Sequence, residues 1–121
     1  MKLYFGGLGH GQDVLAEKET GIKPEICTPE TAFSVPAIDR FEELTKQLVR
    51  DGKDVQAFAR ELLEKNPEVI VICSEIGYGI HPLEREDRIW REQTGRALCI
   101  LAEGAETVTR VICGIGQRIK E

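Results

Sequence analysis

The chain has 121 residues, of which 41% are hydrophobic and 31% are charged, a balance typical of one globular domain and unlike that of a disordered or repetitive chain. Its formal net charge of -5 at pH 7 argues against a broad nucleic-acid or anionic-membrane surface, so any bound anion needs a local site. No apolar run approaches the ~20 residues of a membrane helix, and the start is too short for a signal-peptide core. We therefore expect a cytoplasmic protein with no nucleic-acid or membrane partner.

The chain begins with a short β-prone run, Leu3–Phe5, that leads into a glycine-rich segment, residues 6–11. This segment is too rich in glycine for a helix or the interior of a strand, so we expect a tight loop. The next residues, Gln12–Glu19, are good helix formers, with Val14 and Leu15 placed to face a core. The pattern predicts a strand, a loop and a helix in succession.

Two weaker strand signals and two helices follow. Glu25–Thr28, bracketed by prolines, and Pro36–Asp39 are short β-prone runs. Apolar residues then recur at helical spacing over residues 41–49. They recur again after Asp54, a residue type suited to a helix N-cap, until Asn66 and the following proline end this second helix.

The strongest strand signal is Val69–Cys73, an uninterrupted apolar run. Because polar residues do not alternate with the apolar ones, both faces of this strand should be covered, as in the centre of a parallel sheet. A helix is expected next, from about Leu83 to Glu103, with an apolar stripe along one side. Thr107–Cys113 is the last expected strand.

Strands that alternate with helices predict an α/β fold of three layers, resembling P-loop NTPases, with a mainly parallel sheet and helices on both faces. Residues 1–121 are expected to form this one domain. Ligands of such sheets bind at the carboxyl ends of the strands. Function is therefore expected at residues 6–13, 28–30, 39–40, 74–82 and 114–117.

The four cysteines are widely spaced, without a C-x-x-C pair or a histidine at metal-ligand spacing. They lie among Ile, Leu and Val residues. We expect reduced, mostly buried thiols, and no metal site, at Cys27, Cys73, Cys99 and Cys113.

The glycine loop has the G-x-x-x-x-G spacing of a Walker A motif, with a strand before it and a helix after it. Glycines there let backbone N–H groups and the helix N-terminus approach phosphate oxygens. A full motif continues with Lys and then Ser or Thr, which neutralise phosphate charge and hold Mg2+. Here Gln12 and Asp13 occupy those two positions. We therefore predict a nucleotide site with weakened phosphoryl transfer, formed by Gly6, Gly7, Leu8, Gly9, His10, Gly11, Gln12 and Asp13. The alternative is a glycine-rich turn that binds no ligand.

Two further segments resemble a known family. Residues 74–82, SEIGYGIHP, follow the apolar strand and precede an arginine-rich helix, and residues 114–120, GIGQRIK, close the chain. With the glycine loop, they closely resemble the adenosylcobinamide kinase/adenosylcobinamide-phosphate guanylyltransferase family of cobalamin biosynthesis. The resemblance implies a P-loop sheet that uses GTP or ATP with Mg2+, phosphorylates adenosylcobinamide, and transfers GMP through a guanylylated histidine. It also implies a homo-oligomer and suggests a trimer.

Thr28 and Asp39 take their expected roles from this resemblance. Thr28 matches the end of the family's second strand, and Asp39 matches an acidic residue that closes the third strand near the nucleotide. Glu75 ends a strand at the ligand edge, where it would act as a general base or Mg2+ ligand, or instead cap the loop's own N–H groups. The segment with the family's guanylylated histidine is missing between Thr28 and Val35, so no residue is assigned that role.

Two other features keep alternative interpretations. Tyr78, between two glycines, is suited to stack on a base or a corrin edge, and equally to contact a partner subunit. Arg85, Arg88 and Arg96 share a helical face suited to a phosphate, but the interleaved acidic residues favour a salt-bridged surface helix.

Two functional hypotheses follow. In the first, the chain is a short family member in cobamide assembly or salvage that binds a purine nucleotide, with impaired phosphoryl and guanylyl transfer. In the second, it is a non-catalytic binding or regulatory subunit that keeps the fold and performs no chemistry.

Overall fold

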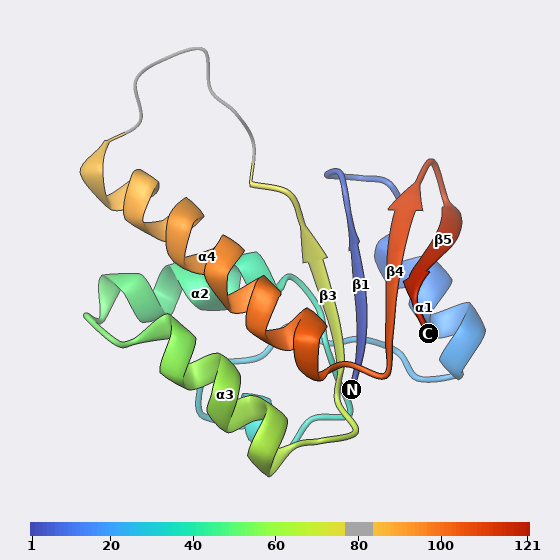
Figure 1. The fold of residues 1–121 in the computed structure, drawn as a ribbon, viewed down its shortest axis with the longest axis horizontal. Coiled ribbons are helices and arrows are strands. Elements are labelled where there is room, and N and C mark those ends of the chain that lie inside the picture. Colours follow the sequence, from blue (N-terminus) through green and yellow to red (C-terminus); the bar gives the residue numbers. More distant parts are fainter. Residues whose placement is uncertain (77–83) are drawn as a thin grey trace.

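The structure is a computed structural model that describes residues 1–76 and 84–121. Its elements in chain order are β1 (Lys2–Gly6), α1 (Gln12–Thr20), a 3-10 turn η1 (Thr31–Phe33), β2 (Ala37–Ile38), α2 (Phe41–Arg50), α3 (Val55–Lys65), β3 (Ile70–Ser74), α4 (Arg85–Gly104), β4 (Thr107–Ile112) and β5 (Ile115–Lys120). The strands form one sheet in the order β2-β3-β1-β4-β5 (Figure 1). Strands β1 to β4 are parallel, and β5 pairs with β4 in the antiparallel direction.

Helices cover both faces of this sheet. Helices α2, α3 and α4 lie on one side and α1 lies on the other (Figure 1). Alternate residues of β1 enter two separate cores, with Leu3 packed in the cluster that includes Leu62 and Leu101, and Tyr4 packed in the cluster that includes Ala16. The three-layer α/β fold with a mainly parallel sheet is therefore confirmed.

The apolar run at residues 69–73 forms β3, which lies between β1 and β2, so both of its faces are covered as expected. The middle strand of the sheet is β1. Beside β3, α2 is joined to α4 by a buried pair of hydroxyls, Thr45 Oγ1 and Thr94 Oγ1, 2.7 Å apart. Asp54 caps α3 as predicted, since its side chain accepts a hydrogen bond from the Ala57 N–H at 3.1 Å.

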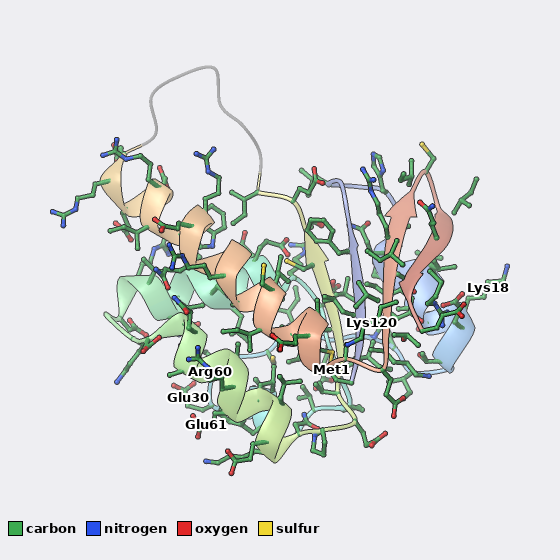
Figure 2. All side chains as sticks on the ribbon, in the orientation of Figure 1. Met1, Lys18, Glu30, Arg60, Glu61 and Lys120 are labelled. Atoms are coloured by element: carbon green, nitrogen blue, oxygen red, sulfur yellow. The ribbon has the colours of Figure 1, made fainter. Side chains whose placement is uncertain are left out.

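The strand predicted at residues 107–113 is present as β4, but it is not the last strand, because the chain turns at Cys113 and Gly114 and returns as β5. Both turn residues have positive φ, +50° and +78°, the geometry of a two-residue hairpin that matches strand twist. At the far end of β5, the Lys120 ammonium donates to the carbonyl oxygens of Ala102 and Glu103 at the end of α4 (Figure 2). The closing segment is thus an edge strand.

Three other expectations also need correction. Residues 25–28 form no strand, and only Glu25 makes an isolated parallel bridge, to Ile38. Val14 is 68% exposed, because the side of α1 that packs on the sheet carries Gln12 and Ala16. The cysteines are not mostly buried: Cys73 is buried and Cys27 is half-buried, whereas Cys99 and Cys113 are exposed, and all four are free thiols.

Among the described residues, no helix is long and apolar enough to cross a membrane.

Candidate functional site

The glycine loop leaves the end of β1 at Gly6 and enters α1 at Gln12, at the carboxyl edge of the parallel strands. Gly9 and Gly11 have φ values of +76° and +85°, which glycine adopts at no steric cost. Gly6 has a different role, because a Cβ there would collide with the carbonyl oxygen of Val111 on β4. The loop therefore keeps the backbone path that its glycines predict.

A cavity of about 380 Å³ lies beside the loop. Its walls come from the loop and the start of α1, from the end of β2 and the start of α2, and from the end of β3. The lining residues are Leu8, Gly9, Gly11, Gln12, Asp13, Asp39, Arg40, Glu42, Glu43, Ile72 and Ser74. The structure thus brings the loop and Asp39, both expected at the site, together around one cavity.

Gln12 stands where a Walker A motif has lysine, and it is 3% exposed. Its amide nitrogen donates to the carbonyl oxygen of Gly7 at 3.0 Å, and it lies 3.3 Å from Ser74 Oγ and 3.4 Å from the carbonyl oxygen of Cys73. A primary amide has two N–H donors, so oxygens of the protein already engage both. The side chain ties the loop to the end of β3 and has no N–H left for a phosphate.

Glu42 is a site residue that sequence reasoning missed. It is 8% exposed, and its Oε1 accepts a hydrogen bond from the backbone N–H of Ser74 at 3.0 Å. Its backbone carbonyl accepts from the indole N–H of Trp90 at 2.8 Å, which fixes the start of α2 against α4. Burial, and next the charge of Glu42, raise the pKa of the Cys73 thiol well above its usual value. The sequence signal that could have identified Glu42 was its position three residues after Asp39, where the ligand-binding edge of the sheet was expected.

The cavity is acidic. Four carboxylates, those of Asp13, Asp39, Glu42 and Glu43, line it with one guanidinium, that of Arg40. Burial, and also the charge of Asp13, raise the pKa of Asp39, although Asp39 Oδ1 accepts a hydrogen bond from the Arg40 N–H at 2.8 Å. The folded state therefore favours the protonated form of Asp39. The contribution of Asp39 to the free energy of unfolding is present at acidic pH and is lost as the pH rises through the raised pKa. A phosphate entering this cavity meets like charge unless a cation accompanies it.

The carboxylates of this cavity are oxygen ligands of the kind that Mg2+ takes. Among the residues that the structure describes, no group of three or more His, Cys, Asp or Glu is arranged to hold a metal ion. Mg2+ usually keeps several waters and takes only one or two carboxylates, with substrate phosphates supplying other oxygens. Asp13 and Asp39, which interact electrostatically and line the same cavity, fit that role.

Leu8 lines the cavity and is 82% exposed. Two other predicted residues, His10 and Thr28, are not part of the cavity lining. The His10 side chain is engaged at the β4–β5 turn, where its Nδ1 accepts from the Cys113 N–H at 3.3 Å. Thr28 is absent from the cavity lining, and its hydroxyl lies 3.1 Å from that of Thr31, within a local turn.

Glu75 lines a second, smaller cavity of about 150 Å³, together with Ser74, Arg91 and Leu98. Its backbone N–H donates to the carbonyl oxygen of Gly6 at 2.9 Å, which continues the β1–β3 ladder to the loop. Tyr78 lies outside the described residues. On α4, Arg96 pairs with Glu92 at 2.8 Å, one turn away, in agreement with a salt-bridged surface helix.

Comparison with known proteins gives one family. The family model described as cobinamide kinase / cobinamide phosphate guanyltransferase matches residues 31–119, well over half of the chain. The matched range includes Asp39, Glu42 and the closing hairpin, and it begins after the glycine loop. No curated protein matches the chain.

Proposed function

Because the chain belongs to the cobinamide kinase / cobinamide phosphate guanyltransferase family, we propose that it binds a purine nucleotide with Mg2+ at the glycine loop. We further propose that it acts in cobalamin biosynthesis or salvage with impaired phosphoryl and guanylyl transfer. GTP and ATP are the candidate nucleotides, and adenosylcobinamide is the candidate acceptor.

The observation that carries this proposal is the glycine loop beside a cavity of about 380 Å³. The loop starts a nine-residue helix, α1, whose N-terminal N–H groups and dipole favour an anion. The four carboxylates around it make a divalent cation necessary for a polyphosphate to enter. Asp13 and Asp39 are the proposed Mg2+ ligands, and the metal would neutralise phosphate charge when bound.

Weak transfer follows from the residue at position 12. A Walker lysine places a positive charge on the β- and γ-phosphates as charge develops in the transition state. Gln12 is neutral, and its N–H groups are engaged by Gly7, Ser74 and Cys73. Losing one preorganised charge-stabilising group typically costs about 100-fold or more in rate.

Calorimetric titration of the intact protein tests nucleotide binding. We expect GTP or ATP to bind weakly with Mg2+ and to show no detectable heat of binding in EDTA, because the acidic cavity repels an uncompensated triphosphate. Asp39→Asn keeps the hydrogen-bond acceptor for the Arg40 N–H and removes one negative charge, so it should reduce the dependence on Mg2+. Tight binding that ignores Mg2+ would contradict the proposed metal role.

The second candidate function is the non-catalytic subunit, and the engaged Gln12 amide favours it. In this candidate the chain is a binding or regulatory subunit that keeps the fold and performs no chemistry, and we expect it to bind neither GTP nor ATP. The titration separates the two, since this candidate gives no heat with either nucleotide, with or without Mg2+. Phosphorylation of adenosylcobinamide at the rate of an ordinary kinase would reject both impaired transfer and this alternative.

A further inference from the structure

The β4–β5 turn reaches the glycine loop from the far end of the chain. The backbone N–H of Gly114 donates to the carbonyl oxygen of His10 at 2.8 Å. The backbone N–H of Cys113 donates to His10 Nδ1 at 3.3 Å. Two consecutive N–H groups of the turn are therefore bonded to one residue of the loop, which uses both its backbone and its side chain.

The conformation of the turn produces this contact. Cys113 and Gly114 both have left-handed backbones, with φ of +50° and +78°, and a turn of this kind is short and stiff. Close approach continues on both sides of the link. A Cβ on Gly11 would lie 3.7 Å from the Gly114 Cα, and a Cβ on Gly116 would lie 2.7 Å from Leu15 Cδ2 on α1. The hairpin thus packs along the loop and the helix that the loop begins.

The link explains the side-chain placement of His10. The loop has its own internal hydrogen bond, from the His10 N–H to the Gly7 carbonyl oxygen at 3.2 Å. That bond closes a turn but does not hold the turn against the sheet. Because Nδ1 accepts a hydrogen bond, the proton of the neutral ring belongs on Nε2. With its proton on Nε2, the half-buried His10 ring lies between the loop and the hairpin and connects them.

We propose that the Cys113–Gly114 turn is a positioning element for the glycine loop, and that His10 is the positioning residue that connects them. The closing hairpin then has a role at the proposed nucleotide site without touching the ligand. Only the expected effect of the turn on nucleotide binding rests on the proposed function. The link itself is a property of the ligand-free protein.

Three His10 variants test the link. Asn places its side-chain oxygen near the position of Nδ1 and can accept the Cys113 N–H, whereas Gln places its oxygen near the position of Nε2, and Ala has no acceptor. In the free protein, amide hydrogen exchange measured by NMR should show about 10-fold lower protection of Cys113 in His10→Gln and His10→Ala, the factor that matches one ordinary hydrogen bond. Protection should be largely restored in His10→Asn. Cys113→Ala keeps the backbone N–H and serves as the matched control that should leave the link intact.

The same spectra test positioning. Exchange at Gly9, Gly11 and Gln12 should rise together with exchange at Cys113 in His10→Gln, and return in His10→Asn. If Mg·GTP binds, its affinity should be lower in His10→Gln than in the parent protein and should recover in His10→Asn. Unchanged Cys113 protection in both His10→Gln and His10→Ala would show that the link does not form. Loss of that protection without any change in the loop amides would show that the hairpin does not position the loop. Failure of nucleotide binding alone leaves both exchange results readable.

Discussion

Replacing Gln12 by lysine and Asp13 by serine together is expected to strengthen the binding of phosphate-bearing ligands by about 1 to 3 kcal/mol, or roughly 5- to 150-fold. The physical reason is that the loop keeps its backbone donors, the lysine adds a cation, and the serine removes one negative charge while its hydroxyl can still hold Mg2+ in place of Asp13. A lysine side chain can be accommodated in place of Gln12, because the Gln12 amide nitrogen is surrounded by oxygens of Gly7, Cys73 and Ser74. An ammonium has three donors for such acceptors, and unlike the amide it carries a positive charge that attracts a phosphate even while these oxygens accept its hydrogen bonds.

The measurement is calorimetry at fixed Mg2+ and moderate salt, because exposed charges are screened. Glu64→Lys is the matched control. It changes the net charge of the chain by the same amount from an exposed position on α3 that does not line the cavity beside the loop. A gain of similar size in the control would mean that overall charge causes the effect. Undetectable binding in the double variant would indicate that the loop is no phosphate site, and the non-catalytic alternative would then be preferred.

Replacing Gly6 by alanine is expected to lower the free energy of unfolding by about 3 kcal/mol. Gly6 pairs with Val111 of β4 on one side and Ser74 of β3 on the other. The new methyl group would meet the carbonyl oxygen of Val111 and lie 3.3 Å from Cδ of Gln12. A backbone oxygen inside a sheet cannot move aside as a flexible side chain would. Such a loss is a large share of the roughly 5 to 15 kcal/mol that stabilises a typical domain.

Urea unfolding of the two proteins measures this cost, with Gly95→Ala as the control. Gly95 lies inside α4, and a Cβ there would meet nothing within 4 Å. The control should therefore stabilise the protein slightly, by up to about 1 kcal/mol, through helix propensity. If Gly6→Ala unfolds at the same urea concentration as the parent, β1 and β4 do not approach as closely as described at the start of the loop.

The parts of the fold that the sequence predicted well are those with strong local signals. The glycine spacing of the loop was interpretable because a strand precedes it and a helix follows it. The unbroken apolar run at residues 69–73 allowed only a strand covered on both faces, and β3 is one. Asp54 was recognised as a cap because the amphipathic pattern of α3 begins directly after it. In each case the local preference and the tertiary structure agree.

Other elements depended on partners that a single sequence does not reveal. Strand β5 was missed because the turn before it contains only one glycine, and a cysteine takes the other left-handed position. Apolar neighbours suggested that Cys99 was buried. On α4, however, it lies two residues from both Ala97 and Leu101, which puts it on the side opposite these buried residues.

The candidate site was predicted in outline. Asp39 and the loop were placed at one edge of the sheet by the rule that parallel strands share their carboxyl ends. Three side-chain contacts in the site join segments that are distant in sequence. The Gln12 amide contacts Ser74 on β3, the Glu42 carboxylate accepts from the Ser74 N–H, and the His10 ring accepts from the Cys113 N–H. Side chains that form such links have no periodicity that marks them in advance.

The most direct test of the nucleotide site is to follow the backbone amides by NMR while Mg·GTP is added, with guanosine as the ligand that lacks phosphate. If the site is where we propose, the amide signals of Gly7, Gly9, Gly11 and the residues around Asp39 will move with Mg·GTP and will stay nearly unchanged with guanosine. The contrary result would be signals that stay fixed at the loop, or that move only elsewhere, for example along the separate groove lined by Phe33 and Phe58.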